Sequence, residues 1–307
     1  MILCSGEALI DMLPRQLADG EAVFAPHAGG AVFNTALALG RLGVDTGFFS
    51  GISTDLFGAQ LVSTLTASKV ATGMAVRSPR PTTLAFVEFV DGQAKYAFYD
   101  ENTAGRMLGV EDLPKLPDNV EAMFFGGISL VAEPCGTAYE ALMLREASVR
   151  VTMIDPNIRP SFISEEPAYR ARLARMMAVA DIVKLSDDDL HWLMGHGDTE
   201  ELSRRILAAG AKLVLITEGA KGAHGFTSTA SAFAPAKKVD VADTVGAGDT
   251  FNAGALVRLN TMGSLTKTGI ASLSSTEIGE VLLLGIRAAA VTVSRPGANP
   301  PWLAELA

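Results

Sequence analysis

Short apolar runs alternate along this chain with longer stretches in which apolar residues recur at helical spacing. The short runs are rich in β-branched and aromatic residues, which favours strands, and they cover residues 2–5, 46–50, 122–125, 151–154, 181–184 and 212–217. Predicted helices lie between them, among them residues 32–42, 137–147, 168–179 and 201–209. Strand, helix and strand in repetition predict an α/β fold: a doubly wound, mostly parallel sheet with helices on both faces.

Two segments break this rhythm. Residues 82–90 and 93–99 have an alternating pattern and are joined by Asp91-Gly92, a strong signal for a β-hairpin. Residues 12–27 lack helical periodicity and are expected to add one or two strands. We therefore expect an α/β core of residues 1–11, 28–80 and 100–307, with a small β lid of residues 12–27 and 81–99. A hairpin that only decorates the sheet edge is the alternative.

Composition narrows the class of protein. The chain has 307 residues, of which 49% are hydrophobic, so it can bury a large core. A formal net charge of −9, without a Lys/Arg cluster, disfavours a nucleic-acid partner. The longest apolar stretch, residues 281–293, is interrupted by Arg287, and the N-terminus lacks a basic signal region, so no membrane association is expected. The two distant cysteines, Cys4 and Cys135, favour a reducing compartment, and we expect a cytoplasmic protein. Residues 260–276 are rich in Ser, Thr and Gly and are expected to contain a surface loop.

Glycines and carboxylates follow the predicted strands, where open α/β sheets bind their ligands. These residues are Gly6-Glu7 with Asp11, Gly51, Gly126-Gly127, Asp155-Pro156-Asn157, Ser186-Asp187 and Glu218-Gly219. The pattern predicts a ligand site at this edge of the sheet.

The most informative motif runs from Asp243 to Asp249 and precedes a predicted helix over residues 250–259. Its small residues allow successive backbone N–H groups to point at one place, which makes an anion hole suited to a phosphoryl group. Asp249 would repel a phosphate, and it fits a general base that takes a proton from a hydroxyl. An aspartate that only caps the helix after a glycine turn is the alternative.

A second motif, Gly29-Gly30, opens an apolar helix and places Asn34 in its first turn, where the amide can meet a polar ligand. Close packing of the helix on the sheet is the alternative explanation. The sequence has no G-x-x-x-x-G-K-[ST] loop and no G-x-G-x-x-G after the first strand, so a P-loop and a dinucleotide site are disfavoured. The four histidines, His27, His191, His196 and His224, show no metal-ligand spacing.

Residues 29–43 and 243–249 resemble the two signatures of the PfkB/ribokinase family of carbohydrate kinases, in the same order and at a similar distance. Weaker similarity extends over residues 6–11, 155–160, 184–187, 217–222 and 295–298, so the resemblance covers nearly the whole chain. It implies a ribokinase-like fold and an ATP-dependent kinase that phosphorylates a small sugar. It also implies Asp249 as the catalytic base, with the backbone of Gly246, Ala247 and Gly248 as the anion hole.

The same resemblance implies roles for further residues. Asp11, Gly30 and Asn34 would hold the sugar hydroxyls, and the nucleotide would lie against Lys184, Thr217, Gly219, Gly222 and Gly248. Asp187 would help to organise Mg²⁺ through water. An acidic run at a helix N-terminus, favoured by the helix dipole, is the alternative for Asp187–Asp189. Asp243, the backbone of Val245 and residues 294–297 would hold a monovalent cation, expected to be K⁺; a turn cap is the alternative for Asp243.

Among the subgroups, bacterial fructokinases are the most similar, through residues 155–159, Lys184 and the segment 96–99 with Arg106. Tyr99, Arg106 and Arg159 therefore join the implied substrate site. Kinases of 2-keto-3-deoxygluconate share several of these features, and there Arg106 or Arg159 would meet the substrate carboxylate. A sugar-binding homologue without turnover belongs to a different class, which the intact Asp249 and anion hole disfavour. Inserted lid strands leave open edges, so we also expect a homodimer formed through residues 81–99.

Overall fold

A sheet of nine strands forms the centre of the computed structural model, counted over the described residues 1–90 and 93–306. The strand order is β15-β14-β13-β12-β11-β10-β1-β4-β6, and all neighbours are parallel except β14 and β15. The six predicted parallel strands are confirmed with small shifts at their ends, whereas β6, β14 and β15 were not predicted. The bounds are β1 Ile2–Ser5, β4 Thr46–Phe49, β6 Val70–Ala71, β10 Ala122–Gly126, β11 Val151–Asp155, β12 Ile182–Ser186, β13 Leu213–Thr217, β14 Gly222–Phe226 and β15 Ser231–Pro235.

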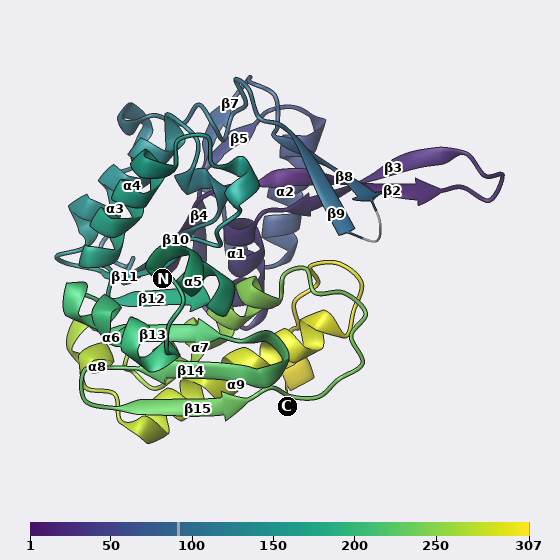
Figure 1. Cartoon of the computed structure of the whole chain (residues 1–307). Coiled ribbons are helices and arrows are strands. Elements are labelled where there is room, and N and C mark those ends of the chain that lie inside the picture. Colours follow the sequence, from purple (N-terminus) through teal and green to yellow (C-terminus); the bar gives the residue numbers. More distant parts are fainter. Residues whose placement is uncertain (91–92, 307) are drawn as a thin grey trace.

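Helices cover both faces of this sheet (Figure 1). One layer contains α1 Ala31–Arg41, α2 Leu56–Ala67, α7 Ala247–Thr261, α8 Lys267–Ala271 and α9 Ser275–Val293. The other contains α3 Cys135–Glu146, α4 Glu166–Val179, α5 Asp187–Met194 and α6 Thr199–Ala209. Short 3₁₀ turns are η1 Val110–Asp112, η2 Ile128–Leu130, η3 Pro160–Phe162, η4 Gly219–Lys221 and η5 Leu303–Leu306. The predicted fold class is confirmed, while α2, α5, α8 and α9 are helices that the sequence analysis did not specify.

Alternation along the strands divides the core into two apolar clusters. Cys4, Phe48 and Phe124 pack under α1 and α7, whereas their strand neighbours Leu3 and Phe125 pack under α3 and α4. Strands that are buried on both faces consist almost entirely of apolar residues, which is why they stood out in the sequence.

A second, four-stranded sheet projects from the body (Figure 1) and has the order β3-β2-β8-β9. We call it the lid sheet; it contains β2 Leu9–Gln16, β3 Ala22–Gly29, β8 Leu84–Val90 and β9 Gln93–Tyr99. The predicted hairpin is confirmed by the pairing of Val90 with Gln93, although the turn residues Asp91 and Gly92 lie outside the described part of the chain. A further pair, β5 Gly51–Ser53 and β7 Val76–Ser78, forms a small parallel sheet.

Other expectations from the sequence can also be compared with the fold. Residues 260–276 do contain a loop, but they also contain the short helix α8, which Thr266 caps through the backbone N–H of Gly269. Cys4 and Cys135 are both free and buried. Among the helices that the structure describes, none is long and apolar enough to cross a membrane.

Strand β1 lies between β4 and β10, so the chain changes direction across the sheet at this point. Ligands of open α/β sheets bind in the crevice beside such a switch point, at the carboxyl ends of the strands. Here that crevice lies between Gly6-Glu7 after β1 and Gly126-Gly127 at the end of β10.

Helices α7 and α9 cross where two glycines meet. A Cβ added to Gly254 would lie 2.7 Å from Gly285 Cα and 2.8 Å from Leu284 O, which are backbone atoms that cannot move aside. This close approach holds α7, and with it the motif at its N-terminus, against the sheet layer.

We therefore expect Gly254→Ala to destabilise the fold by about 1–3 kcal/mol, because overpacking outweighs the helix propensity of alanine. Gly279→Ala is the matched control, since it lies on α9 with nothing within 4 Å of the added Cβ. That change should raise stability by up to about 1 kcal/mol. Urea unfolding followed by circular dichroism measures both, and equal effects would contradict the packing explanation.

Candidate active site

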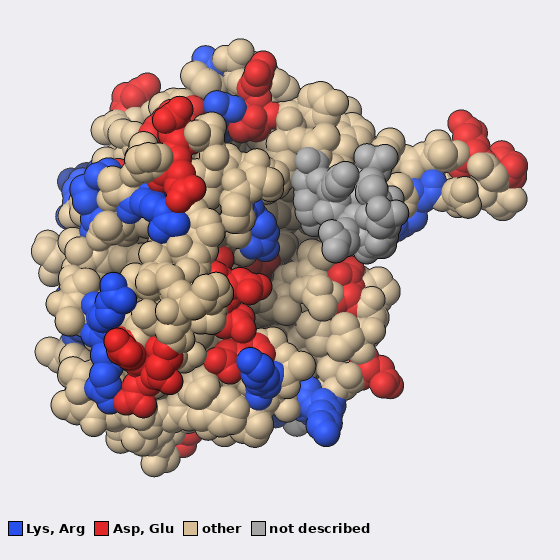
Figure 2. All heavy atoms as spheres, viewed as in Figure 1, with Lys and Arg blue, Asp and Glu red and all other residues tan. Residues whose placement is uncertain are grey.

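A cavity of about 330 Å³, which we call the site cavity, lies where β1, β11 and β12 end and where α1 and α7 begin. A space-filling view shows a hollow on this face of the molecule with acidic side chains beside it (Figure 2). The cavity brings together many of the residues predicted from the sequence: Asp11, Gly30, Asn34, Arg159, Lys184, Val245, Gly246, Ala247, Gly248 and Asp249. They come from both halves of the chain, as a site at the carboxyl ends of parallel strands requires.

Asp249 lies in the first turn of α7 and is only 7% exposed. Its Oδ2 accepts a hydrogen bond of 2.9 Å from Nδ2 of Asn34, on the buried helix α1. Burial raises the pKa of Asp249 to about 7, and the bond from Asn34 opposes only part of that rise. A carboxylate with a pKa near neutrality is suited to accept a proton from a hydroxyl.

The N-termini of α1 and α7 have different environments. Glu7 caps the N-terminus of α1, because its Oε1 accepts hydrogen bonds from the backbone N–H of Ala31 at 2.8 Å and of Val32 at 3.3 Å. Helix α7 begins after Gly246, which has a φ of 78° and no side chain that caps the helix. The N–H of Ala247 donates to the carbonyl of Thr244 at 3.3 Å, whereas those of Gly248 and Asp249 have no acceptor among the described residues. Both residues line the site cavity, where the helix dipole favours an anion.

A buried cation faces this open helix end. Lys184 on β12 is 4% exposed, and a Cβ at Gly248 would lie 3.2 Å from its Nζ. The ammonium group donates to Asp155 Oδ2 at 2.9 Å, and the same oxygen accepts from Asn252 Nδ2 at 2.7 Å. The ion pair and the amide hold Lys184 at the N-terminus of α7, where its charge adds to that of the helix dipole.

Asp11 enters the cavity from β2 of the lid sheet, opposite α7. Burial raises the pKa of this carboxyl to about 6. The structure gives the Asp11 carboxylate no hydrogen-bond donor among the described residues, which leaves both oxygens able to accept from ligand hydroxyls.

Taken together, the site cavity offers an anion hole, a buried cation, a base with a pKa near 7 and a carboxylate for hydroxyl groups. Two buried amide oxygens, Asn34 Oδ1 and Asn252 Oδ1, have no hydrogen-bond partner in the described part of the chain. These groups fit the transfer of a phosphoryl group to a hydroxyl of a small polar acceptor.

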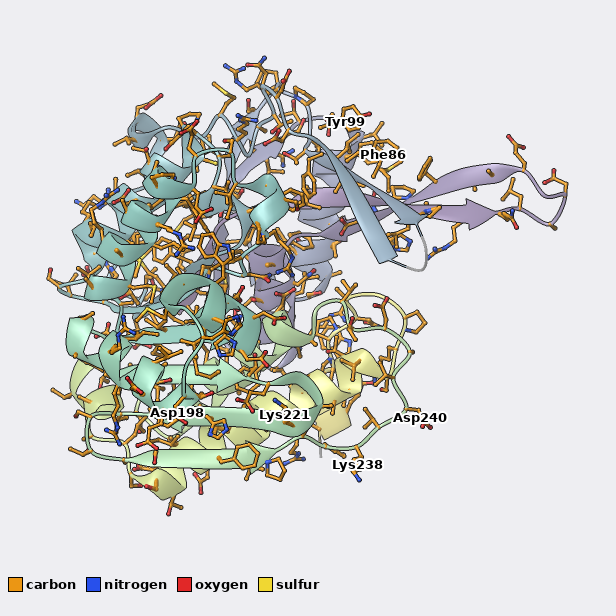
Figure 3. All side chains as sticks on the ribbon, in the orientation of Figure 1. Phe86, Tyr99, Asp198, Lys221, Lys238 and Asp240 are labelled. Carbon is orange, nitrogen blue, oxygen red and sulfur yellow. The ribbon has the colours of Figure 1, made fainter. Side chains whose placement is uncertain are left out.

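Two residues of the implied substrate site lie elsewhere. Tyr99 is 62% exposed on the lid sheet and packs against Phe86, with ring centroids 5.4 Å apart (Figure 3). Arg106 forms an ion pair of 2.9 Å with Asp100 and lines a neighbouring cavity instead. Neither residue is among those that line the site cavity, so their contact with the substrate stays a prediction that this cavity does not support.

Of the residues implied for the nucleotide and the metal ions, Lys184, Val245 and Gly248 line the site cavity. The others lie in neighbouring turns outside it. Thr217 is the last residue of β13 and pairs with the end of β12. Gly219 is the first residue of the following turn, η4, and Gly222 comes directly after it. Lys221 of this turn faces the same side of the molecule as Lys238 and Asp240 of the loop that leads to α7 (Figure 3). Asp187 is the first residue of α5.

Asp243 connects two loops. Its carboxylate accepts from the backbone N–H of Val245 at 3.0 Å and of Gly297 at 2.9 Å. The segment with the open helix end is thereby fixed to the loop after α9.

The sequence analysis missed three residues that organise the cavity: Glu7, Asp155 and Asn252. Glu7 and Asp155 were noted only as strand-end carboxylates, and their position directly after β1 and at the end of β11 was the available signal. Asn252 follows Asp249 by three residues on α7, so it lies on the same helix face, and this spacing was the signal for it.

Three comparisons with known proteins show what this chain is similar to. The model of the pfkB family carbohydrate kinase matches residues 1–305. A fructokinase from Rhizobium leguminosarum bv. trifolii is 56% identical over 273 residues, which cover 89% of this chain and 84% of that protein. The structure of a fructokinase with bound ATP from Xylella fastidiosa has a TM-score of 0.88 at 29% identity and covers 99% of this chain and 96% of that one.

A fructokinase double mutant from Vibrio cholerae O395, in a fructose-, ADP- and potassium-bound form, is also similar. It has a TM-score of 0.84 at 26% identity, over 99% of this chain and 96% of that one.

The raised pKa of Asp249 predicts a pH-dependent stability difference. The folded pKa of about 7 exceeds the ordinary value of 3.8, so the folded state binds this proton more tightly. Wild-type stability therefore falls by about 1.4 kcal/mol per pH unit between about pH 4 and pH 7, relative to Asp249→Asn, which has no such proton. We expect the two proteins to be similar in stability near pH 4 and the variant to be more stable at pH 8. Urea unfolding across this range measures the difference, and Asp240→Asn, an exposed carboxylate, should track the wild type.

Proposed function

This chain belongs to the pfkB family of carbohydrate kinases, and we propose that it transfers the γ-phosphoryl group of ATP to a hydroxyl of D-fructose. The observation that carries the proposal is the buried Asp249 carboxyl beside the open N-terminus of α7 and Lys184. The fructokinases that resemble the chain, from the 56% identical relative to the solved structures, favour fructose as the acceptor.

In the proposed reaction, Asp249 accepts the proton of the attacking hydroxyl while that oxygen forms a bond to the γ-phosphorus. The bond between the γ-phosphorus and the bridging oxygen breaks, and ADP leaves. The N–H groups of Gly246, Ala247 and Gly248 stabilise the charge on the transferred group, and Lys184 neutralises part of it.

On the acceptor side, Asp11, Gly30 and Asn34 are proposed to bind the sugar hydroxyls, with Arg159 at the mouth of the cavity. A volume of about 330 Å³ suits one monosaccharide. Because Asn34 also donates a hydrogen bond to Asp249, the proposed sugar-binding amide and the base are held at a fixed distance from each other.

On the donor side, Thr217, Gly219 and Gly222 are proposed to contact the nucleotide, since their turn lies at the carboxyl end of β13. The open helix end and Lys184 fit a phosphate chain, and Asp187 with its carboxylate oxygens fits a water-mediated contact to Mg²⁺. Bound Mg²⁺ would neutralise phosphate charge beside the acidic groups of the cavity.

Assembly and location are also proposed. The lid sheet exposes Tyr99 at 62%, which supports a homodimer through residues 81–99. Light scattering that gives the mass of a single chain at micromolar concentration would contradict it.

The free, buried Cys4 and Cys135 support a cytoplasmic protein, which cell fractionation tests.

The substrate proposal is tested by coupled assays with ATP and a panel of fructose, ribose, 2-keto-3-deoxygluconate and adenosine. We expect fructose to have the highest kcat/KM. A preference for 2-keto-3-deoxygluconate would favour the alternative activity. In the structure Arg106, one candidate for its carboxylate, is already paired with Asp100. Sugar binding without ATP consumption would mean a homologue that does not catalyse transfer.

The role of Asp249 as base predicts that Asp249→Asn lowers kcat by about 10²–10⁴ while the KM values for fructose and ATP stay near wild type. Asparagine keeps the acceptor for Asn34 Nδ2, so the site should keep its shape. In the wild type kcat/KM should rise with pH up to about 7, as Asp249 loses its proton, and the remaining activity of the variant should lack this rise. A variant that keeps more than about a tenth of wild-type kcat would contradict the assignment.

If Asp243, the backbone of Val245 and residues 294–297 hold a monovalent cation, potassium should stimulate turnover. The two hydrogen bonds from Val245 and Gly297 to Asp243 support this proposal, because they join the two loops involved. We expect a higher rate in KCl than in NaCl at equal chloride, and loss of that difference in Asp243→Ala but not in Asp240→Asn. Equal wild-type rates in the two salts would contradict the proposed cation site.

A further inference from the structure

A second cavity of about 410 Å³, which we call the side cavity, adjoins the site cavity. Phe98, Ile128 and Phe162 line both cavities, so these three apolar side chains form the partition between them. The remaining walls of the two cavities are different: Asp249 and Lys184 line only the site cavity, and Arg106 lines only the side cavity.

The partition depends on one aromatic contact between the lid sheet and the core. Phe98 lies on β9, whereas Phe162 ends η3, in the loop that follows β11. Their ring centroids are 4.5 Å apart with an interplanar angle of 61°, which is an edge-to-face contact. Rings at this separation leave no room for a sugar ring to pass between them.

The side cavity has the chemistry of a site for a neutral polyhydroxyl group. Its charged lining residues are Asp100, Glu133, Glu165, Arg106 and Arg172, so carboxylates outnumber guanidinium groups. Both guanidinium groups are already paired, Arg106 with Asp100 at 2.9 Å and Arg172 with Glu140 at 3.3 Å and with Glu133. A phosphate or carboxylate would find no spare cation there, whereas sugar hydroxyls can donate to the carboxylates and C–H faces can pack on the aromatic rings.

Building on the proposed function, we infer that the Phe98–Phe162 pair sets the length of the acceptor. The closed pair limits the enzyme to a single sugar ring in the site cavity. When the pair is opened, the side cavity accepts a second, neutral sugar unit attached to that ring, since its volume of about 410 Å³ exceeds that of the site cavity.

The test compares kcat/KM for fructose with kcat/KM for lactulose, turanose and inulobiose. In these ketose disaccharides the second sugar occupies a different hydroxyl of a fructose unit, so at least one linkage should point toward the partition. We expect the wild type to prefer fructose strongly. In Phe162→Ala and in Phe98→Ala the ratio of disaccharide to fructose should rise at least about tenfold for one of the three, the scale on which pocket size discriminates substrates.

Two further variants sharpen the result. Ile163→Ala is the matched control, because Ile163 adjoins Phe162 in sequence and lines only the side cavity; its ratio should stay at the wild-type value. Phe162→Leu keeps an apolar side chain whose size lies between those of alanine and phenylalanine, so it should give an intermediate ratio. This variant still tests the inference if the alanine variants fold poorly.

The inference is overturned if the wild type phosphorylates a disaccharide as efficiently as fructose. It is equally overturned if no variant of the pair raises the ratio while fructose turnover is still measurable, or if Ile163→Ala raises it as much as Phe162→Ala. A wild type that does not phosphorylate fructose contradicts the proposed function instead, so the two failures are distinguishable.

Discussion

The burial of the Asp249 carboxyl at the uncapped N-terminus of α7 is the constraint on which the site depends. A carboxyl held out of water has a pKa near 7 and is a useful base, but it also weakens the fold whenever it is ionised. The surrounding structure limits that cost. Asn34 donates one hydrogen bond to the carboxylate, and the close crossing at Gly254 and Gly285 holds α7 in position.

The acidic groups around the cavity divide into those that are occupied and those that are available. Glu7 is engaged by the N-terminus of α1, and Asp155 is engaged by Lys184 and Asn252. Asp249 and Asp11 keep acceptor capacity that faces the cavity. Glu7 and Asp155 are therefore held in structural hydrogen bonds, whereas Asp249 and Asp11 remain able to accept from a ligand, although all four carboxylates line the site cavity.

The lid sheet contributes to the site at two places far apart in the sequence. Asp11 on β2 supplies a polar group to the cavity, and Phe98 on β9 closes it against Phe162 of the core. Because β2 pairs with β8, and β8 with β9, one small sheet fixes both side chains together. The proposed recognition of an acceptor and the proposed limit on its size thus depend on the same element.

The sequence by itself determined the fold class, because strands that are buried on both faces are recognisable as apolar runs. In addition, Asp91-Gly92 indicates a hairpin turn and Gly29-Gly30 indicates the start of a helix. It also pointed to Asp249, Asn34 and Asp11, which lie in motifs or shortly after a predicted strand, and to Lys184 through the family resemblance; all four line the site cavity. Only the tertiary structure decided that Arg106 pairs with Asp100 outside the site cavity, that Asp155 and Asn252 hold Lys184, and that Phe98 meets Phe162. The physical reason is that these contacts join residues from separate elements. Phe98 and Phe162 are 64 positions apart and Asp155 and Asn252 are 97 apart, and the spacing of residues within one element does not indicate which distant element it will contact.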